Sequence, residues 1–335
     1  MIIRAPQFWN KKGFISNLLL PISFIWIFFS KLKSKFSKSI NSPLPVICIG
    51  NISIGGSGKT PLTREISKLL KDRGYNTCIL TKGYKGKAKG PILVNNNLYT
   101  VKEIGDEPLM LNKYDQVCVS KDRYSGVNFI NEQTNADVII MDDGMQNPHI
   151  TKDFTIGVFD GKHGIQNGRI IPAGPLRETM EDGVKKIDIF FINGNDRTNL
   201  KNSIPESKLT VNGKLLPSRK KVREIKNKKY IAFSGINDPQ RFFSTLIDNN
   251  IILFKTFSFP DHYNFKESDL KRIYNVSCKF KCRLITTEKD WVRLTYKWRN
   301  LVNYLEVNFQ IEKNQKTKMI NQILSKLDRC GWLPY

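Results

Sequence analysis

The chain has 335 residues, of which 40% are hydrophobic, so it is long enough for two domains and apolar enough to bury a proper core. Its six cysteines include no C-x-x-C pair, which excludes a disulfide framework and a zinc site and indicates reduced thiols in a cytosolic protein. A formal net charge of +24 favours an anionic partner such as a nucleotide, a phospholipid or a nucleic acid, although a compositional bias toward lysine would give the same charge without any function.

An apolar stretch, residues 14–29, lies near the start of the chain and has lysines on both sides. A helix that spans a bilayer needs about 20 apolar residues, whereas this stretch is shorter and contains Asn17 and Pro21. No small-residue cleavage site of a signal peptide follows it. We expect residues 1–40 to form a membrane-associating region whose helix dips into one leaflet and sets its lysines on anionic head groups. The alternative is a hydrophobic helix that packs on the body of the protein.

The rest of the chain is organised around residues 45–61, PVICIGNISIGGSGKTP. Four apolar residues predict a short buried strand, a glycine-rich turn follows it, and a helical pattern begins after the turn. This order is the context of a phosphate-binding loop, because glycines let backbone N–H groups surround an anion and the helix N-terminus adds positive potential. Lys59 would then reach the β- and γ-phosphates of a nucleotide, and the Thr60 hydroxyl would bind Mg²⁺.

The turn departs from the usual spacing at one position, because Ser53 stands where a glycine is expected. A plain glycine-rich turn with a chance Lys-Thr pair is therefore the alternative. The residues that we expect to contact the nucleotide are those of the turn itself: Ser53, Ile54, Gly55, Gly56, Ser57, Gly58, Lys59 and Thr60.

Two pairs of acidic residues follow the loop. Asp142 and Asp143 end a predicted strand, where ligands of open α/β sheets gather and where a carboxylate would hold Mg²⁺. Asp106 and Glu107 stand at a predicted helix start, which fits a catalytic role but also the ordinary preference of acids for a first helical turn. Residues 168–178, with two prolines, two glycines and two arginines, indicate either a shaped loop near an anion or a plain turn.

Residues 214–229 are polar and basic, and we interpret them as a linker between a first domain, residues 41–213, and a second α/β domain, residues 230–335. The second domain alternates strand and helix patterns but has no glycine-rich loop of its own. Its most reactive group is His262, which lies beside Asp261 in a loop after a strand. A histidine there can transfer protons or donate to phosphate, or it can be a satisfied structural residue.

Seven motifs together resemble those of the tetraacyldisaccharide 4′-kinases, the lipid A 4′-kinases of the inner membrane. The phosphate loop GNISIGGSGKTP at residues 50–61 is the first, and Ser53 belongs to this family's own loop. The others, in chain order, are LTKGY (80–84), GDEP (105–108), DDGMQN (142–147), PAGPLRE (172–178), FPDHY (259–263) and TTEKD (286–290). Their order and their spread over nearly the whole chain make the resemblance specific.

The resemblance implies an α/β fold: a P-loop NTPase-like αβα sandwich, a second, smaller αβα domain across a cleft, and an N-terminal apolar helix. It also implies ATP-dependent phosphorylation of the 4′-hydroxyl of a tetraacylated glucosamine disaccharide 1-phosphate, at the cytoplasmic face of the bacterial inner membrane. Carried onto the matching positions, Asp106 is the base that takes the hydroxyl proton, His262 assists it, and Lys59 binds the phosphates. 

The same resemblance implies roles for further polar residues. Mg²⁺ and nucleotide-site oxygens are expected from Thr60, Glu107, Asp142 and Asp143. Contacts to the lipid substrate are expected from Arg123, Asn147 and Arg177.

Two functions of other classes fit parts of the sequence. A membrane-recruited, partitioning-type ATPase has a lysine early in its phosphate loop, where this chain has Ile54, which argues against it. A basic nucleic-acid-binding module would explain the charge, but the sequence has neither a C-x-x-C finger nor an aromatic RNA-binding signature, so we expect no nucleic-acid partner. The expected partners are ATP, the lipid A disaccharide 1-phosphate precursor and the lipid surface of the inner membrane.

Overall fold

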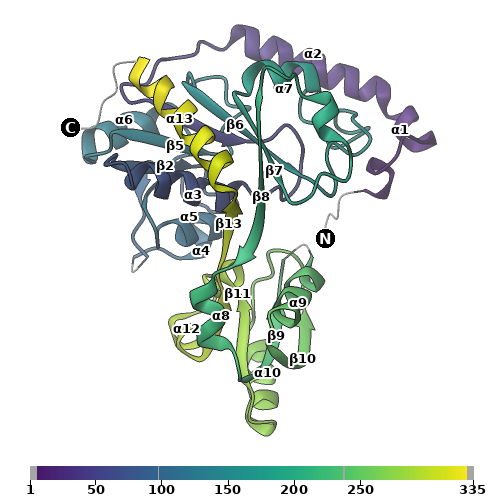
Figure 1. The fold of residues 1–335 in the computed structure, drawn as a ribbon, viewed down its shortest axis with the longest axis vertical. Coiled ribbons are helices and arrows are strands. Elements are labelled where there is room, and N and C mark those ends of the chain that lie inside the picture. The colour runs from purple at the N-terminus through teal and green to yellow at the C-terminus, as the bar shows by residue number, and fades with distance from the viewer. Residues whose placement is uncertain (1–5, 97, 237, 330–335) are drawn as a thin grey trace.

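The structure, a computed structural model, describes residues 6–96, 98–236 and 238–329. Within these residues the chain forms two sheets (Figure 1). The larger has nine strands in the order β13-β8-β7-β6-β1-β5-β2-β4-β3. Its strands are β1 (Val46–Gly50), β2 (Thr77–Thr81), β3 (Ile92–Leu93), β4 (Gln116–Val119), β5 (Val138–Asp142), β6 (Phe154–Asp160), β7 (Ile189–Asn193), β8 (Leu209–Pro217) and β13 (Val307–Ile311).

The larger sheet is parallel except at its two edges, where β13 pairs antiparallel with β8 and β3 with β4. Its central strands are buried on both faces, as their near-continuous apolar runs require. Alternate side chains point to opposite faces: Ile47 of β1 joins the core under α3 and α13, whereas Val46 joins the core under α6. The expected αβα sandwich is therefore confirmed.

Helices of the larger unit are α3 (Lys59–Lys71), α4 (Val101–Ile104), α5 (Asp106–Leu111), α6 (Arg123–Gln133), α7 (Met180–Lys186), the 3₁₀ turn η2 (Leu200–Ser203) and α13 (Lys313–Arg329). The buried cysteines Cys48, Cys78 and Cys118 lie in β1, β2 and β4 and are free thiols. Cys330 lies outside the described residues.

The smaller sheet is parallel throughout, in the order β10-β9-β11-β12. Its core splits into two layers, one under α8 and α9 and one under α10 and α12, so this unit is also layered αβα. The elements are α8 (Arg219–Ile225), β9 (Lys229–Ser234), α9 (Pro239–Asp248), β10 (Ile252–Ser258), α10 (Glu267–Lys279), β11 (Arg283–Thr287), α11 (Glu288–Trp291), α12 (Tyr296–Leu301) and β12 (Val302–Leu305).

The sheets divide the chain differently from the expected ranges. Residues 214–229, expected as a linker, lie largely in regular elements: β8 runs on to Pro217 and α8 follows it. Their polar composition reflects a largely exposed strand end and a helix that buries only Ile225. The expected range 230–335 also spans both sheets, because β13 and α13 return to the larger one (Figure 1). Two antiparallel strands, β8 and β13, thus connect the two units.

A buried carboxylate of the smaller unit also ties the two sheets together. Glu288, at the start of α11, lies 3.2 Å from Arg64 Nη1 and 2.7 Å from Lys113 Nζ, both in the larger unit. The Tyr114 hydroxyl donates to the same carboxylate at 2.8 Å. Because all these partners are at least partly buried, the contact fixes how the units face each other.

The apolar N-terminal stretch forms η1 (Gln7–Trp9), α1 (Phe14–Leu18) and α2 (Leu20–Phe36) along one side of the larger unit (Figure 1). One face is held by the loop at residues 168–178: Ser16 Oγ donates to the Ala173 carbonyl at 2.7 Å and Ser23 Oγ to the Ile170 carbonyl at 2.8 Å. The opposite face exposes large apolar side chains, among them Phe14, Leu18, Phe24, Phe28 and Phe29. None of the helices in the described ranges has the length and apolar character needed to cross a bilayer.

Candidate active site

The glycine-rich turn that follows β1 lies at the carboxyl edge of the larger sheet, and its glycines determine the path of its backbone. Gly55 and Gly58 have φ values of 137° and 98°, in the region that favours glycine. Gly58 also has no room for a side chain, because a Cβ there would come within 2.9 Å of Asn193 Nδ2. The Ile54 amide donates a hydrogen bond to the Pro175 carbonyl at 2.8 Å, which ties the turn to the loop at residues 168–178.

Lys59 is the first residue of α3, directly after this turn, and its side chain folds back over the turn. Its Nζ lies 3.4 Å from Asn51 Oδ1 and 3.7 Å from Asp143 Oδ1. Asn51 in turn donates from Nδ2 to Ser57 Oγ at 3.2 Å. The ammonium group is thus held at the mouth of the turn, where a bound phosphate would meet it.

The two acids at the end of β5 lie beside the start of α3. Asp142 Oδ2 accepts from the Thr60 hydroxyl at 3.4 Å, and its Oδ1 accepts from Thr63 at 3.2 Å. Burial, and then the charges of Glu107 and Asp143, raise the pKa of Asp142 to about 7. Adjacent strands β1 and β5 bring these groups together because they are parallel and end at the same edge.

Asp106 reaches the same edge of the sheet from the start of α5. Gly105 precedes it with φ of 90°, and a Cβ on Gly105 would come within 2.5 Å of the Tyr84 carbonyl, so α5 begins directly on the turn that follows β2. The Asp106 carboxylate is buried, and its Oδ1 accepts from the Glu107 amide at 3.0 Å.

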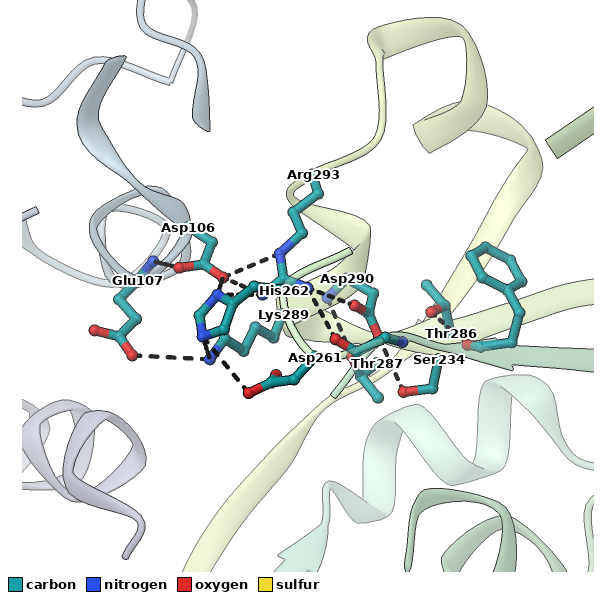
Figure 2. Close-up of polar contacts among 12 residues, drawn as sticks. Asp106, Glu107, Ser234, Asp261, His262, Thr286, Thr287, Lys289, Asp290 and Arg293 are labelled. Carbon is teal, nitrogen blue, oxygen red and sulfur yellow. Dashed lines mark hydrogen bonds and ion pairs between the residues drawn. The ribbon is translucent and has the colours of Figure 1, made fainter. Parts of the chain in front are cut away.

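His262 approaches Asp106 from the smaller unit, in the loop after β10 (Figure 2). Its Nδ1 lies 3.1 Å from Asp106 Oδ2, and its ring packs edge-on against Tyr84 with 5.8 Å between ring centroids. The expected pair therefore meets across the junction of the two units. Both ring nitrogens have partners, so the satisfied structural histidine that the sequence also allowed describes the same contacts.

Two basic residues complete the cluster, and neither was predicted. Lys289 Nζ lies 3.2 Å from His262 Nε2 and 3.9 Å from Glu107 Oε1 (Figure 2). Arg293 donates from Nε to Asp106 Oδ2 at 3.0 Å. Burial would raise the pKa of Asp106, but the hydrogen bond from His262 and the charges of Lys289 and Arg293 hold it well below its ordinary value.

A sequence signal for these basic residues exists only in part. Lys289 belongs to the TTEKD motif, and Arg293 lies three residues after Asp290, a spacing that places two side chains on one face of a helical turn. The partner of Arg293 is 187 positions away along the chain, so no local pattern connects them.

Glu107 links the two halves of the site. Its carboxylate faces Lys289, and its negative charge contributes to the raised pKa of Asp142. In the described parts of the chain no cluster of three or more His, Cys, Asp or Glu side chains is arranged to hold a metal ion by itself. Thr60 nevertheless bonds Asp142, Asp143 lies 3.7 Å from Lys59, and Glu107 is close enough for its charge to raise the pKa of Asp142.

The three residues expected to contact the lipid substrate differ in placement. Arg177 lies in the site: its Nη1 donates to Asp143 Oδ1 at 3.1 Å. Arg123 is buried and donates to the Ser120 carbonyl; burial lowers its pKa, and the charge of Asp142 opposes that effect. Asn147 accepts from the His149 amide at 3.0 Å and so shapes its own turn.

A polar hollow of about 580 Å³ lies at the same edge of the sheet, on the β7 and β8 side. Asn193, at the end of β7, donates from Nδ2 to the Ser57 carbonyl at 3.1 Å, so the hollow begins beside the glycine-rich turn. Asn193 Oδ1 is buried and accepts no hydrogen bond within the described residues. The hollow is lined by side-chain amides such as Asn195, Asn212 and Gln310 and by charged residues of both signs, Asp196, Lys201, Lys214 and Glu312.

A family model described as tetraacyldisaccharide-1-P 4′-kinase matches residues 15–327. The chain belongs to the tetraacyldisaccharide 4′-kinase family. A tetraacyldisaccharide 4′-kinase of Gluconobacter oxydans is 36% identical over 309 residues, covering 92% of this chain and 94% of that protein. One of Rickettsia canadensis is 40% identical over 311 residues, covering 91% and 93%.

Among solved structures, the chain is similar to one described as the "apo" form of LpxK from Aquifex aeolicus in complex with ATP. The two share 28% identity with a TM-score of 0.75, and the match covers 92% of this chain and 99% of that one. As a member of the tetraacyldisaccharide 4′-kinase family, the chain is an enzyme of lipid A biosynthesis, and the kinase expected from the sequence motifs is confirmed.

Proposed function

We propose that this enzyme transfers the γ-phosphoryl group of ATP to the 4′-hydroxyl of a tetraacylated glucosamine disaccharide 1-phosphate. One observation carries the proposal. A phosphate-binding turn ending in Lys59 and a buried carboxylate, Asp106, occupy the same edge of one sheet, with Glu107 between them. Phosphoryl transfer needs this pairing, because it depends mainly on positioning and on charge stabilisation around the transferred group.

ATP is proposed to bind with its phosphates in the turn of residues 53–60. The backbone of this turn and the N-terminus of α3 supply N–H donors, and Lys59 supplies a positive charge toward the β- and γ-phosphates. The polar hollow beside Asn193 is of a size typical of ligand sites and lies next to the turn. We place the nucleoside end of ATP there, where the side-chain amides of Asn195, Asn212 and Gln310 offer hydrogen bonds to a base.

Mg²⁺ is proposed to bind through oxygens of Thr60, Asp142, Asp143 and Glu107. Hard oxygen donors are the ligands that Mg²⁺ prefers. Burial, and then the negative charges of Glu107 and Asp143, disfavour ionisation of Asp142, and a bound cation would offset both effects. When bound, Mg²⁺ neutralises charge that develops on the β- and γ-phosphates.

Asp106 is proposed to take the proton of the 4′-hydroxyl as its oxygen attacks the γ-phosphorus. The bond from that phosphorus to the bridging oxygen of ADP breaks, and the proton ends on Asp106. His262 assists by holding the carboxylate through Nδ1, at 3.1 Å. Arg177, which lies against Asp143, is available to neutralise phosphate charge near the reacting group.

We further propose that α1 and α2 dock the enzyme on the cytoplasmic face of the inner membrane. The exposed apolar face of these helices and the flanking lysines suit the boundary between acyl chains and anionic head groups. The acceptor is itself a lipid, so docking would bring its sugar to the site while its acyl chains stay in the bilayer. The same helices hold the 168–178 loop, whose Pro175 carbonyl pins the phosphate-binding turn.

The test is product identity. Purified protein is incubated with ATP, Mg²⁺ and the disaccharide 1-phosphate lipid, and the lipid is examined by mass spectrometry and ³¹P NMR. The proposal predicts a bisphosphate with the new phosphate at the 4′ position, and none with Lys59→Ala. A product phosphorylated elsewhere, or no product, would remove the proposal.

A further inference from the structure

Arg293 lies between two buried carboxylates at the junction of the two units (Figure 2). Its side chain is 4% exposed. On one side Nη1 donates to Asp290 Oδ1 at 2.8 Å, and to the Gly235 carbonyl at 3.2 Å. On the other side Nε donates to Asp106 Oδ2 at 3.0 Å, and Nη2 bonds the same oxygen.

The guanidinium group is held in one orientation by the smaller unit. Asp290 is fully buried, and its Oδ2 accepts from Ser234 Oγ at 3.0 Å, from the Gly235 amide at 2.9 Å and from Thr287 Oγ1 at 2.8 Å. These donors lie at the carboxyl ends of β9 and β11 (Figure 2). Because Asp290 is held by these donors, it fixes one side of the planar Arg293 guanidinium group. The other side then presents a fixed pair of N–H donors to Asp106.

The hydrogen bonds of Asp106 are distributed unequally between its two oxygens. Oδ2 faces Nε and Nη2 of Arg293 and Nδ1 of His262. Oδ1 accepts only the Glu107 amide at 3.0 Å within the described residues. Because each carboxylate oxygen has two lone pairs, Oδ2 is saturated and Oδ1 retains an acceptor site.

Each ring nitrogen of His262 lies between a cation and a carboxylate. Nδ1 lies 3.1 Å from Asp106 Oδ2 and 3.0 Å from Arg293 Nη2. Nε2 lies 3.2 Å from Lys289 Nζ and 3.9 Å from Asp261 Oδ2. Oδ2 is therefore the oxygen of Asp106 that His262 and Arg293 both approach.

We propose that Arg293 is a positioning residue for phosphoryl transfer: with His262 it occupies Oδ2 of Asp106 and leaves Oδ1 as the atom that takes the proton of the attacking hydroxyl. The electrons of the breaking O–H bond stay on the hydroxyl oxygen, which forms the new bond to the γ-phosphorus while the bond from that phosphorus to the bridging oxygen of ADP breaks. The proton ends on Oδ1 of Asp106. This inference rests on the proposed function. It assigns a task to a residue outside the seven sequence motifs.

Loss of the arginine acts on the rate through Asp106. Without the two N–H donors of the arginine the carboxylate is free to rotate, and misplacing a reacting group by about 1 Å can cost about 100-fold in rate. Because the arginine acts through this carboxylate, its loss should cost little in an enzyme that already lacks the carboxylate, such as Asp106→Asn.

The experiment compares the wild-type enzyme with Arg293→Gln, Arg293→Lys and the control Arg283→Gln, which changes an exposed arginine of the same unit. For each, kcat and the two KM values are measured with lipid and ATP, and Arg293→Gln is also combined with Asp106→Asn. Arg293→Gln should lower kcat by about 10- to 100-fold with little change in either KM, but should lower the kcat of Asp106→Asn by less than about twofold. Arg293→Lys, which has a point charge in place of the planar pair of donors, should not restore kcat.

Three results would overturn the inference. The first is a kcat for Arg293→Gln within about twofold of wild type; the second is a higher kcat, which would make the arginine inhibitory; the third is an equal fold-loss of kcat in the wild-type and the Asp106→Asn enzymes, which a purely structural role would give. If Arg293→Gln does not fold, the same comparison is made with Arg293→Lys. An inactive wild-type enzyme would refute the proposed function itself, which is a distinguishable outcome.

Discussion

Replacing Asp142 with asparagine is expected to stabilise the nucleotide-free enzyme while abolishing its response to Mg²⁺ and ATP. The carboxylate is buried at the end of β5, and the charges of Glu107 and Asp143 act against its ionisation. Asparagine keeps an acceptor oxygen for the hydroxyls of Thr60 and Thr63 but has no charge to be repelled.

The magnitude follows from the pKa of Asp142, which these causes raise from 3.8 to about 7. At about 1.4 kcal/mol per unit, the shift corresponds to about 4 kcal/mol. The folded protein holds this proton more tightly than the unfolded chain does, so the free energy of unfolding falls as pH rises from about 4 to about 7 and then levels off. Between pH 6 and pH 8 this group alone accounts for a loss of about 1 to 2 kcal/mol.

The assay is urea denaturation followed by tryptophan fluorescence, at pH 6, 7 and 8, for wild type, Asp142→Asn and the exposed control Asp248→Asn. The difference between Asp142→Asn and wild type should grow with pH and reach a few kcal/mol at pH 8, whereas the control should run parallel to wild type. In a thermal shift at pH 8, Mg²⁺ with ATP should raise the midpoint of wild type but not of Asp142→Asn.

If the free energies of unfolding of wild type and Asp142→Asn changed equally with pH over this range, ionisation of the Asp142 carboxylate would not be disfavoured in the folded protein, and the reasoning would fail. A variant less stable than wild type at pH 8 would contradict the reasoning more strongly, because it would make the ionised carboxylate a net stabilising group.

Three further predictions concern the turn, the junction and the N-terminal helices. Lys59→Ala should abolish turnover with an unchanged circular dichroism spectrum; near-normal activity would remove Lys59 from the phosphate site. Glu288→Gln should lower the free energy of unfolding by about 3 to 5 kcal/mol, because it leaves the buried ends of Arg64 and Lys113 without their shared anion; a loss below about 1 kcal/mol would contradict this. Replacing the exposed Phe24 and Phe28 with serine should reduce sedimentation with anionic vesicles at least tenfold and leave ATP binding intact; unchanged sedimentation would refute membrane docking.

Much of the site follows from local sequence patterns. A buried apolar run, a glycine turn and Lys59 at a helix start are adjacent in the chain, so the sequence alone predicts the phosphate-binding turn. Asp142 is predictable for a similar reason, because parallel strands end at a common edge and its strand is recognisable from its apolar run. His262 was predicted as reactive from its loop position, and its partner from family resemblance.

The parts that local patterns missed depend on contacts between distant segments. Arg293 acquires its role only when the smaller unit brings it to Asp106, 187 positions earlier. The return of β13 to the larger sheet was missed for the same reason, since a short amphipathic strand does not encode which sheet it joins. The N-terminal helix shows a third case: apolar composition predicted either membrane contact or packing, and the folded chain uses one face for packing and leaves the other exposed.

The central claim is that a nucleotide bound at Lys59 delivers its terminal phosphoryl group to a hydroxyl deprotonated by Asp106. Single-turnover transfer of label from [γ-³²P]ATP to the lipid, measured with excess wild-type enzyme and with excess Asp106→Asn, tests it most directly. The account predicts rapid labelling of the 4′ position by wild type, and labelling at least 100-fold slower by Asp106→Asn with ATP affinity unchanged. Labelling by Asp106→Asn at close to the wild-type rate would contradict it.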